Sequence, residues 1–180
     1  RVIVDEARTH NINIRTLSRM ELDKLFPGVS HQGIVAHCVK AKSYTEDDLD
    51  DLLDALDTPP FLLILDGVQD PHNLGACLRS ANAAGVHIVI APADHSVGLT
   101  PVARKVASGA AEVTPFIQVT NLARTLRKLK ERGIWLFGAS AEDATPIYKA
   151  DLRGAVALVL GAEGQGLRRL TKEICDYLVV

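Results

Sequence analysis

The chain has 180 residues, of which 47% are hydrophobic and 23% are charged. This composition is typical of a globular protein with enough apolar residues for a full core, and it excludes disordered, collagen-like and low-complexity classes. Lysine and arginine number 20 against 22 acidic residues, for a net charge of −2. The overall charge therefore does not indicate a nucleic-acid-binding protein, although a local patch or a dimer groove can still attract RNA.

The cysteines Cys38, Cys77 and Cys175 are far apart, and no two have C-x-x-C spacing. Neither a disulfide framework nor a structural zinc site is expected, and a reducing cytoplasm fits this pattern. The longest apolar runs, 61–65 and 155–160, are far shorter than the roughly 20 residues that span a bilayer. We therefore expect no membrane partner and no metal.

The first 60 residues predict small elements. Residues 1–40 contain a short alternating segment at 11–16, a small helix at 18–26 and an apolar strand at 33–39. The acidic stretch 46–57 carries leucines at helical spacing before two prolines, which predicts an amphipathic helix that bridges into the main domain. We expect its carboxylates to form a solvated face.

From Phe61 onward, apolar runs alternate with amphipathic segments. The predicted strands are 61–66, 86–90, 113–119, 134–138, 155–160 and 177–180, and the predicted helices are 73–84, 101–107, 120–131 and 166–175. Continuous apolar strands separated by helices predict an α/β fold, a parallel sheet flanked by helices on both faces. In such sheets ligands bind beyond the carboxyl ends of the strands, so the informative residues should follow the strands.

The segment after the first strand contains the strongest motif, Asp70 to Gly85, which reads DPHNLGACLRSANAAG. Asn73 stands where a helix N-cap is expected, and Gly75 allows a close approach to a neighbour. Arg79 lies about 240° further round the helix, so helical geometry alone does not bring it to Asn73. Taken singly, Asn73 is explained by capping and Arg79 by a solvated helix surface.

A glycine-rich turn follows the strand at 155–160, with Gly161, Gly164 and Gly166 before a helix. Such a turn lets backbone amides approach a ligand. Its order is G-x-x-G-x-G instead of the G-x-G-x-x-G of dinucleotide folds, and no ribose-binding acid follows. A nicotinamide-dependent oxidoreductase remains an alternative, disfavoured by this order.

These motifs resemble the SpoU (TrmH) branch of the SPOUT RNA 2′-O-ribose methyltransferases. The resemblance begins with Asp70 to Gly85, continues through Lys105–Glu112 and Val119–Arg124, and includes the second signature, Leu158–Gly166. It covers nearly all of 31–180 and is closest to the bacterial enzymes that methylate a guanosine of 23S ribosomal RNA. A transfer-RNA ribose methyltransferase and a non-catalytic RNA-binding relative are the alternatives within this fold.

The resemblance implies a site and a cofactor. Members of the family use S-adenosyl-L-methionine, and Ala139, Leu160, Gly161 and Gly166 match positions that line its pocket. The matching catalytic residues are Asn73, Arg79 and Glu163, with Glu163 organising the site by orienting Asn73. Lys105 and Ser108, with Arg79, are candidates for RNA contact. His72 is read as a turn residue, and the basic cluster at 124–132 as a solvated surface.

Arg79 matches a family arginine sometimes described as the general base. Removing a proton from a guanidinium at neutral pH would cost roughly 7 kcal/mol, because its pKa lies above about 12. We therefore expect Arg79 to bind the phosphate beside the target ribose and to stabilise the developing alkoxide. Asn73 would then fix either Arg79 or the ribose.

The resemblance also implies a domain organisation. Residues 1–40 resemble the C-terminal part of an L30e-like α+β RNA-binding domain, 41–60 form the acidic helix and linker, and 61–180 form the SPOUT trefoil-knot methyltransferase domain. The family's third signature, which closes the knot, would follow Val180, so both ends are expected to be truncated and the 180 residues alone to be inactive. The resemblance further implies a homodimer, with 23S ribosomal RNA as its partner.

Overall fold

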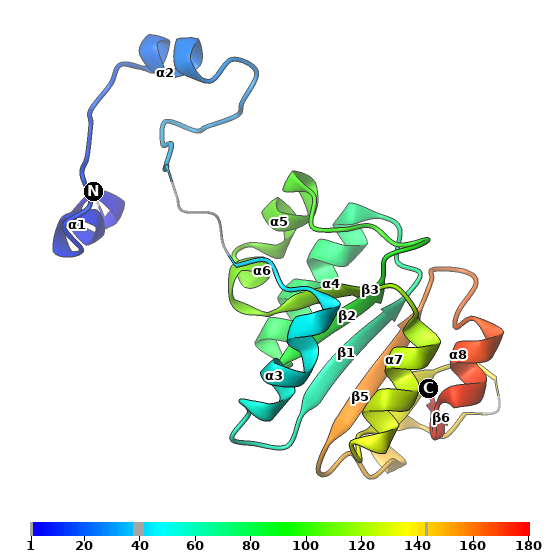
Figure 1. Cartoon of the computed structure of the whole chain (residues 1–180). Coiled ribbons are helices and arrows are strands. Elements are labelled where there is room, and N and C mark those ends of the chain that lie inside the picture. Colours follow the sequence, from blue (N-terminus) through cyan, green and yellow to red (C-terminus); the bar gives the residue numbers. More distant parts are fainter. Residues whose placement is uncertain (1, 38–41, 143) are drawn as a thin grey trace. The chain divides into compact units, whose positions relative to one another are not determined.

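The computed structural model describes residues 2–37, 42–142 and 144–180 (Figure 1). The chain divides into two compact units, Arg1–Lys40 and Ala41–Val180. Among the described residues, no helix combines the length and the apolar character needed to cross a membrane.

The first unit contains two short helices, α1 (Val2–Thr9) and α2 (Arg19–Leu25). Helix α2 begins with a capping box, in which the Glu21 amide donates to Ser18 Oγ and the Ser18 amide donates to Glu21 Oε2. The predicted helix at 18–26 is thus confirmed, whereas α1 was not predicted.

The strand predicted at 33–39 is wrong for residues 33–37, which form no strand, and residues 38 and 39 lie outside the described part. The alternating segment at 11–16 forms no strand either. Ile34 and Val35 are 56% and 40% exposed. Because a strand needs a neighbour to pair its amides and carbonyls, an apolar pattern without such a neighbour does not become one.

The second unit is built on a six-stranded sheet in the order β3-β2-β1-β5-β4-β6, with every pairing parallel. The strands are β1 (Phe61–Asp66), β2 (Ile88–Pro92), β3 (Phe116–Val119), β4 (Trp135–Ala139), β5 (Val156–Gly161) and β6 (Tyr177–Val179). All six predicted strands and the parallel α/β class are confirmed. The third strand is shorter than predicted, since Ala110–Val113 forms a helical turn, α6.

Helices cover the sheet on both faces (Figure 1). On one face lie α3 (Leu49–Asp54), α7 (Leu122–Glu131) and α8 (Arg169–Ile174), and on the other lie α4 (Pro71–Ala83), α5 (Pro101–Ala107) and α6. Strand β1 serves both cores, since Leu62 and Ile64 pack into the first and Leu63 and Leu65 into the second.

The acidic helix α3, which follows a 3₁₀ turn at Glu46–Asp48, is packed against the sheet. Leu49 and Leu53 are buried in the core shared with α7, so the segment predicted as a linker is part of the second unit. The expected solvated face of 46–57 is only partly solvated, because three of its carboxylates pair with basic residues of α7 or with Arg132, which follows α7. These pairs are Glu46 with Arg124, Asp50 with Lys128 and Arg132, and Asp54 with Arg132.

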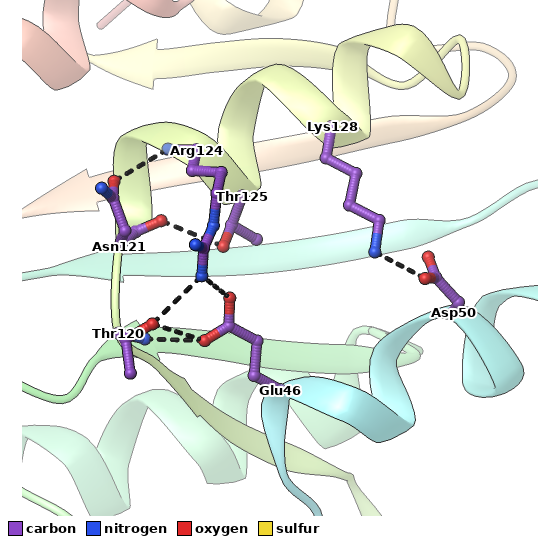
Figure 2. A network of polar contacts seen from close by, with 7 residues as sticks. All are labelled: Glu46, Asp50, Thr120, Asn121, Arg124, Thr125 and Lys128. Atoms are coloured by element: carbon purple, nitrogen blue, oxygen red, sulfur yellow. Dashed lines mark hydrogen bonds and ion pairs between the residues drawn. The ribbon is translucent and has the colours of Figure 1, made fainter.

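Glu46 makes the most extensive of these contacts (Figure 2). Its carboxylate accepts hydrogen bonds from the Thr120 amide and hydroxyl, both at 2.9 Å, and from Arg124 Nη2 at 2.8 Å. The Thr120 amide, and then Arg124, hold the pKa of Glu46 below its usual value. The carboxylate thus caps the turn that leads into α7.

We expect Glu46→Gln to lower the free energy of unfolding by about 1 kcal/mol at neutral pH, because charge-assisted hydrogen bonds become neutral ones. A carboxyl whose pKa is lowered in the folded state stabilises above its unfolded pKa and loses this contribution as the pH falls through its folded pKa. Urea unfolding should therefore show the difference in free energy at pH 7 and lose it in acid, below the ordinary pKa of a glutamate. The control is Glu131→Gln. A difference in unfolding free energy that does not change with pH would contradict the stabilising role of the ionised Glu46 carboxylate.

Candidate functional site

The two motif-bearing loops lie side by side at the carboxyl edge of the sheet. Strands β1 and β5 are neighbours in parallel register, with Asp66 opposite Gly161. The loop after β1 leads into α4, and the loop after β5 is the glycine-rich turn. Segments about 90 residues apart in the sequence therefore meet at the edge where ligands bind parallel sheets.

The glycine-rich turn closes on itself. The Ala162 amide donates to the Gly166 carbonyl at 3.0 Å, and the Gly166 amide donates to the Ala162 carbonyl at 2.9 Å. Gly164 and Gly166 have φ of 76° and 67°, in the left-handed region that favours glycine. A Cβ on Gly161 would lie 2.0 Å from the carbonyl carbon of Gly166. Close backbone contact thus requires glycine at 161.

A hollow of about 620 Å³ lies between this turn and the ends of β4 and β6. Its lining includes all four residues predicted to bind the cofactor, namely Ala139, Leu160, Gly161 and Gly166. Leu167 and Val179 add apolar wall, while Glu142 and Lys172 add charge. The volume is within the range of about 300–1,000 Å³ for small-molecule sites.

Asn73 and Glu163 contact each other across the edge of the sheet. Asn73 Nδ2 donates to Glu163 Oε2 at 3.0 Å, joining the start of α4 to the glycine-rich turn. The predicted contact is present, but the prediction of Asn73 as N-cap is wrong. Asp70 caps α4 by accepting from the His72 amide, and Pro71 is the first helical residue, since it lacks an amide hydrogen and has a helical φ. The Asn73 side chain is therefore available for Glu163.

Arg79 lies on the exposed side of α4, two turns beyond Asn73. Within the described residues, no hydrogen bond or ion pair engages its guanidinium, and Asn73 does not contact it. Of the two roles expected for Asn73, fixing Arg79 is thus absent from the structure. An exposed arginine without an internal partner has all its donors available for a phosphate.

Lys105 and Ser108, the other predicted RNA contacts, lie at the end of α5 and are exposed. Ser108 has φ of 52° and Gly109 has φ of 92°, so two successive left-handed residues separate α5 from α6. Helix α5 packs closely on α4, since a Cβ on Gly75 would lie 2.6 Å from that of Val106. Among the described residues, no hydrogen bond or ion pair joins Lys105 or Ser108 to the Asn73–Glu163 pair.

The sequence interpretation missed Asp66 and Arg168. Asp66, the last residue of β1, is 1% exposed and accepts from Arg168 Nε at 2.6 Å and from the Arg168 amide at 3.0 Å. A carboxylate at the end of a buried strand could have indicated a site. Its partner could not be identified, because 102 residues separate the two in the sequence.

Two cysteines of the second unit, Cys77 and Cys175, are partly buried. Burial raises the pKa of the Cys77 thiol, and burial, then the Asp176 charge, raises that of Cys175 to about 11. Since the thiolate is the nucleophile, we expect iodoacetamide at pH 8 to label Cys175 about 100-fold more slowly than an ordinary thiol. Mass spectrometry of labelled peptides measures this rate, with urea-unfolded protein as the reference. Equal rates in folded and unfolded protein would contradict the burial.

Comparison with known proteins identifies the family. The profile described as "SpoU rRNA Methylase family" matches residues 60–180, which include both motifs. The chain belongs to this SpoU family. A second profile, "RNA 2'-O ribose methyltransferase substrate binding", matches residues 1–44.

Individual relatives of this SpoU chain are similar over almost its whole length. The 23S rRNA (guanosine-2'-O-)-methyltransferase RlmB of Coxiella burnetii is 56% identical over 98% of this chain and 70% of its own length. That of Shewanella oneidensis is 55% identical, covering 98% and 72%. Among solved structures, the SpoU methyltransferase AviRb from Streptomyces viridochromogenes, in complex with AdoMet, has a TM-score of 0.67 at 24% identity and covers 74% of this chain and 53% of its own. The structural likeness supports the fold.

Proposed function

We propose that this protein, at its full natural length, transfers a methyl group from S-adenosyl-L-methionine to the ribose 2′-hydroxyl of a guanosine in 23S ribosomal RNA. The observation that carries the proposal is the identity above 50%, over 98% of the chain, to curated RlmB enzymes. Such identity favours the ribosomal substrate over transfer RNA. The family membership leaves no role for the nicotinamide alternative.

The hollow beside the glycine-rich turn fits the cofactor. Its apolar residues suit the flat faces of an adenine, and the backbone at Leu160, Gly161 and Gly166 can supply hydrogen bonds without a side chain in the way. Ala139 is small enough to leave room on the β4 side. When bound, S-adenosyl-L-methionine supplies an electrophilic methyl group on a sulfonium. These four residues are the proposed cofactor site.

The chain's own residues would align the ribose oxygen and stabilise its charge. Arg79 would bind the phosphate next to the target ribose in a bidentate manner and stabilise the developing alkoxide. Glu163 holds the Asn73 amide through its hydrogen bond, so the Asn73 carbonyl oxygen can accept from the ribose. Alignment of reacting groups can supply roughly 7–11 kcal/mol of the barrier.

The other residues extend this proposal to the RNA and to a second subunit. Lys105 and Ser108 would contact the RNA beyond the target nucleotide, and residues 1–40 would contribute an RNA-binding domain, in keeping with the profile matched by 1–44. We propose a cytoplasmic location, because ribosomal RNA modification requires access to that RNA. We also propose a homodimer, which the family resemblance implies. The trefoil knot stays a prediction from the resemblance.

The deciding experiment measures methyl incorporation. The protein at its full natural length is incubated with labelled S-adenosyl-L-methionine and with undermethylated ribosomal RNA or transfer RNA. We expect label in 23S RNA at a guanosine 2′-oxygen, located by mass spectrometry of nuclease fragments. Label in transfer RNA alone would overturn the substrate, and RNA binding without methyl transfer would support a non-catalytic relative.

A further inference from the structure

The buried carboxylate of Asp66 has a single arginine partner, Arg168. Arg168 Nε lies 2.6 Å and Nη2 lies 2.5 Å from Asp66 Oδ1, and the Arg168 amide donates to Oδ2 at 3.0 Å. The Asp66 side chain is 0% exposed, whereas that of Arg168 is 48% exposed. A carboxylate so far from water requires its partner, so this contact fixes where residue 168 lies.

This contact fixes the exit of the glycine-rich turn. The turn starts at the end of β5, which the sheet holds, and it ends at Arg168, just before α8. Between these points, glycines with many accessible conformations provide little rigidity of their own. The other anchors are the Ala162–Gly166 bridge inside the turn and the exposed Asn73–Glu163 hydrogen bond. Asp66 is the only buried side chain among these anchors.

The segment held by Asp66 separates two hollows. Gln165, Gly166 and Leu167 line the proposed cofactor hollow and also line a second hollow of about 240 Å³. The second hollow includes Asp66 and Arg168 themselves, with Gln69 and His95 from the loops after β1 and β2. A displacement of this shared wall would therefore alter both hollows and would carry Glu163 away from Asn73.

We propose that Asp66 and Arg168 are positioning residues for methyl transfer: their ion pair holds the wall between the two hollows, and through it the cofactor hollow and Glu163. This inference rests on the proposed function for its kinetic consequences. Its structural part, the fixing of residues 162–167, stands without it. A misplacement of about 1 Å at a reacting centre can lower the rate about 100-fold.

The test compares Asp66→Asn and Arg168→Lys with wild type at full natural length. Arg168→Lys keeps the positive charge and the backbone amide but loses the two-pronged contact. The control is Asp151→Asn, which breaks an exposed pair with Arg153; neither residue lines either hollow. The measurements are hydrogen exchange at the Ala162 and Gly166 amides without ligand, calorimetric affinity for S-adenosyl-L-methionine, and kcat and KM for RNA.

We expect at least tenfold faster exchange at these two amides, at least tenfold weaker cofactor affinity and about 100-fold lower kcat in Asp66→Asn. Arg168→Lys should show the same three changes to a smaller extent, and Asp151→Asn should behave as wild type in all three measurements. Wild-type exchange in both variants, or acceleration spread evenly over all strands, would overturn the proposal. If Asp66→Asn fails to fold, Arg168→Lys decides by the same measurements. If wild type neither binds the cofactor nor methylates RNA, the proposed function fails, while the exchange rates still test the positioning role.

Discussion

Replacing Gly161 with alanine is expected to weaken cofactor binding strongly while leaving the domain folded. The added Cβ would lie 2.0 Å and 2.1 Å from the carbonyl carbon and oxygen of Gly166 and 2.3 Å from the Leu167 nitrogen. Ordinary overpacking costs about 1–3 kcal/mol where side chains can yield, but here only backbone can move. We therefore expect affinity for S-adenosyl-L-methionine to fall by about 100-fold or more, equivalent to roughly 3 kcal/mol.

Calorimetric titration measures this loss, and circular dichroism reports whether the sheet persists. The matched control is Gly98→Ala, where the new Cβ would meet only the side-chain end of Gln118, at 2.9 Å. That side chain can rotate away, so the control should bind as wild type. A Gly161→Ala variant with wild-type affinity would show that the turn does not form the cofactor site.

Replacing Arg79 is expected to slow methyl transfer without weakening cofactor binding. Removing a preorganised donor that stabilises transition-state charge typically costs about 10²–10³ in kcat, and we expect this loss for Arg79→Ala. Arg79→Lys should remain impaired, because an ammonium cannot make the bidentate phosphate contact. Single-turnover methylation measures the rate, and calorimetry the cofactor affinity.

Two further readouts separate the phosphate-binding role from a general base. A lysine acting as base at position 79 would move the pH–rate profile, since its ordinary pKa is about 10.4. Loss of a phosphate contact would instead reduce the salt dependence of RNA binding by about one counterion. Arg127→Ala on the exposed side of α7 is the control. Near-normal turnover in Arg79→Lys would exclude the bidentate contact.

The sequence predicted the second unit well because its signals are local. Continuous apolar strands and amphipathic helices identify a parallel sheet. Placing the motifs after strands located the start of α4, which carries Asn73, and the glycine-rich turn. The errors occurred where a neighbour decides the structure. Residues 33–37 belong to an apolar run but have no partner strand among the described residues. Asn73 was assigned as N-cap because Pro71 was not counted as the first helical residue.

Ion pairs between residues far apart in the sequence could not be predicted from the sequence alone. The carboxylates of 46–57 were predicted to form a solvated face. Two of them have partners on α7 that lie 78 residues away in the sequence, in the pairs Glu46–Arg124 and Asp50–Lys128. The same holds for Asp66 and Arg168, which only the adjacency of β1 and β5 brings together. By contrast, Ala139, Leu160, Gly161 and Gly166 were nominated by resemblance, and the structure places all four around one hollow.

The position of β5 beside β1 has a consequence for how the protein folds. Among the paired strands, β1 (61–66) and β5 (156–161) are separated by the longest stretch of chain. The loops that follow these two strands also form the candidate site. Non-local parallel pairing forms slowly, because the entropy of closing the loop is lost before contacts compensate for it. Local helices can form before β1 and β5 pair, when the cofactor hollow does not yet exist. Ligand-binding capacity should therefore return late during refolding, after most of the helical signal.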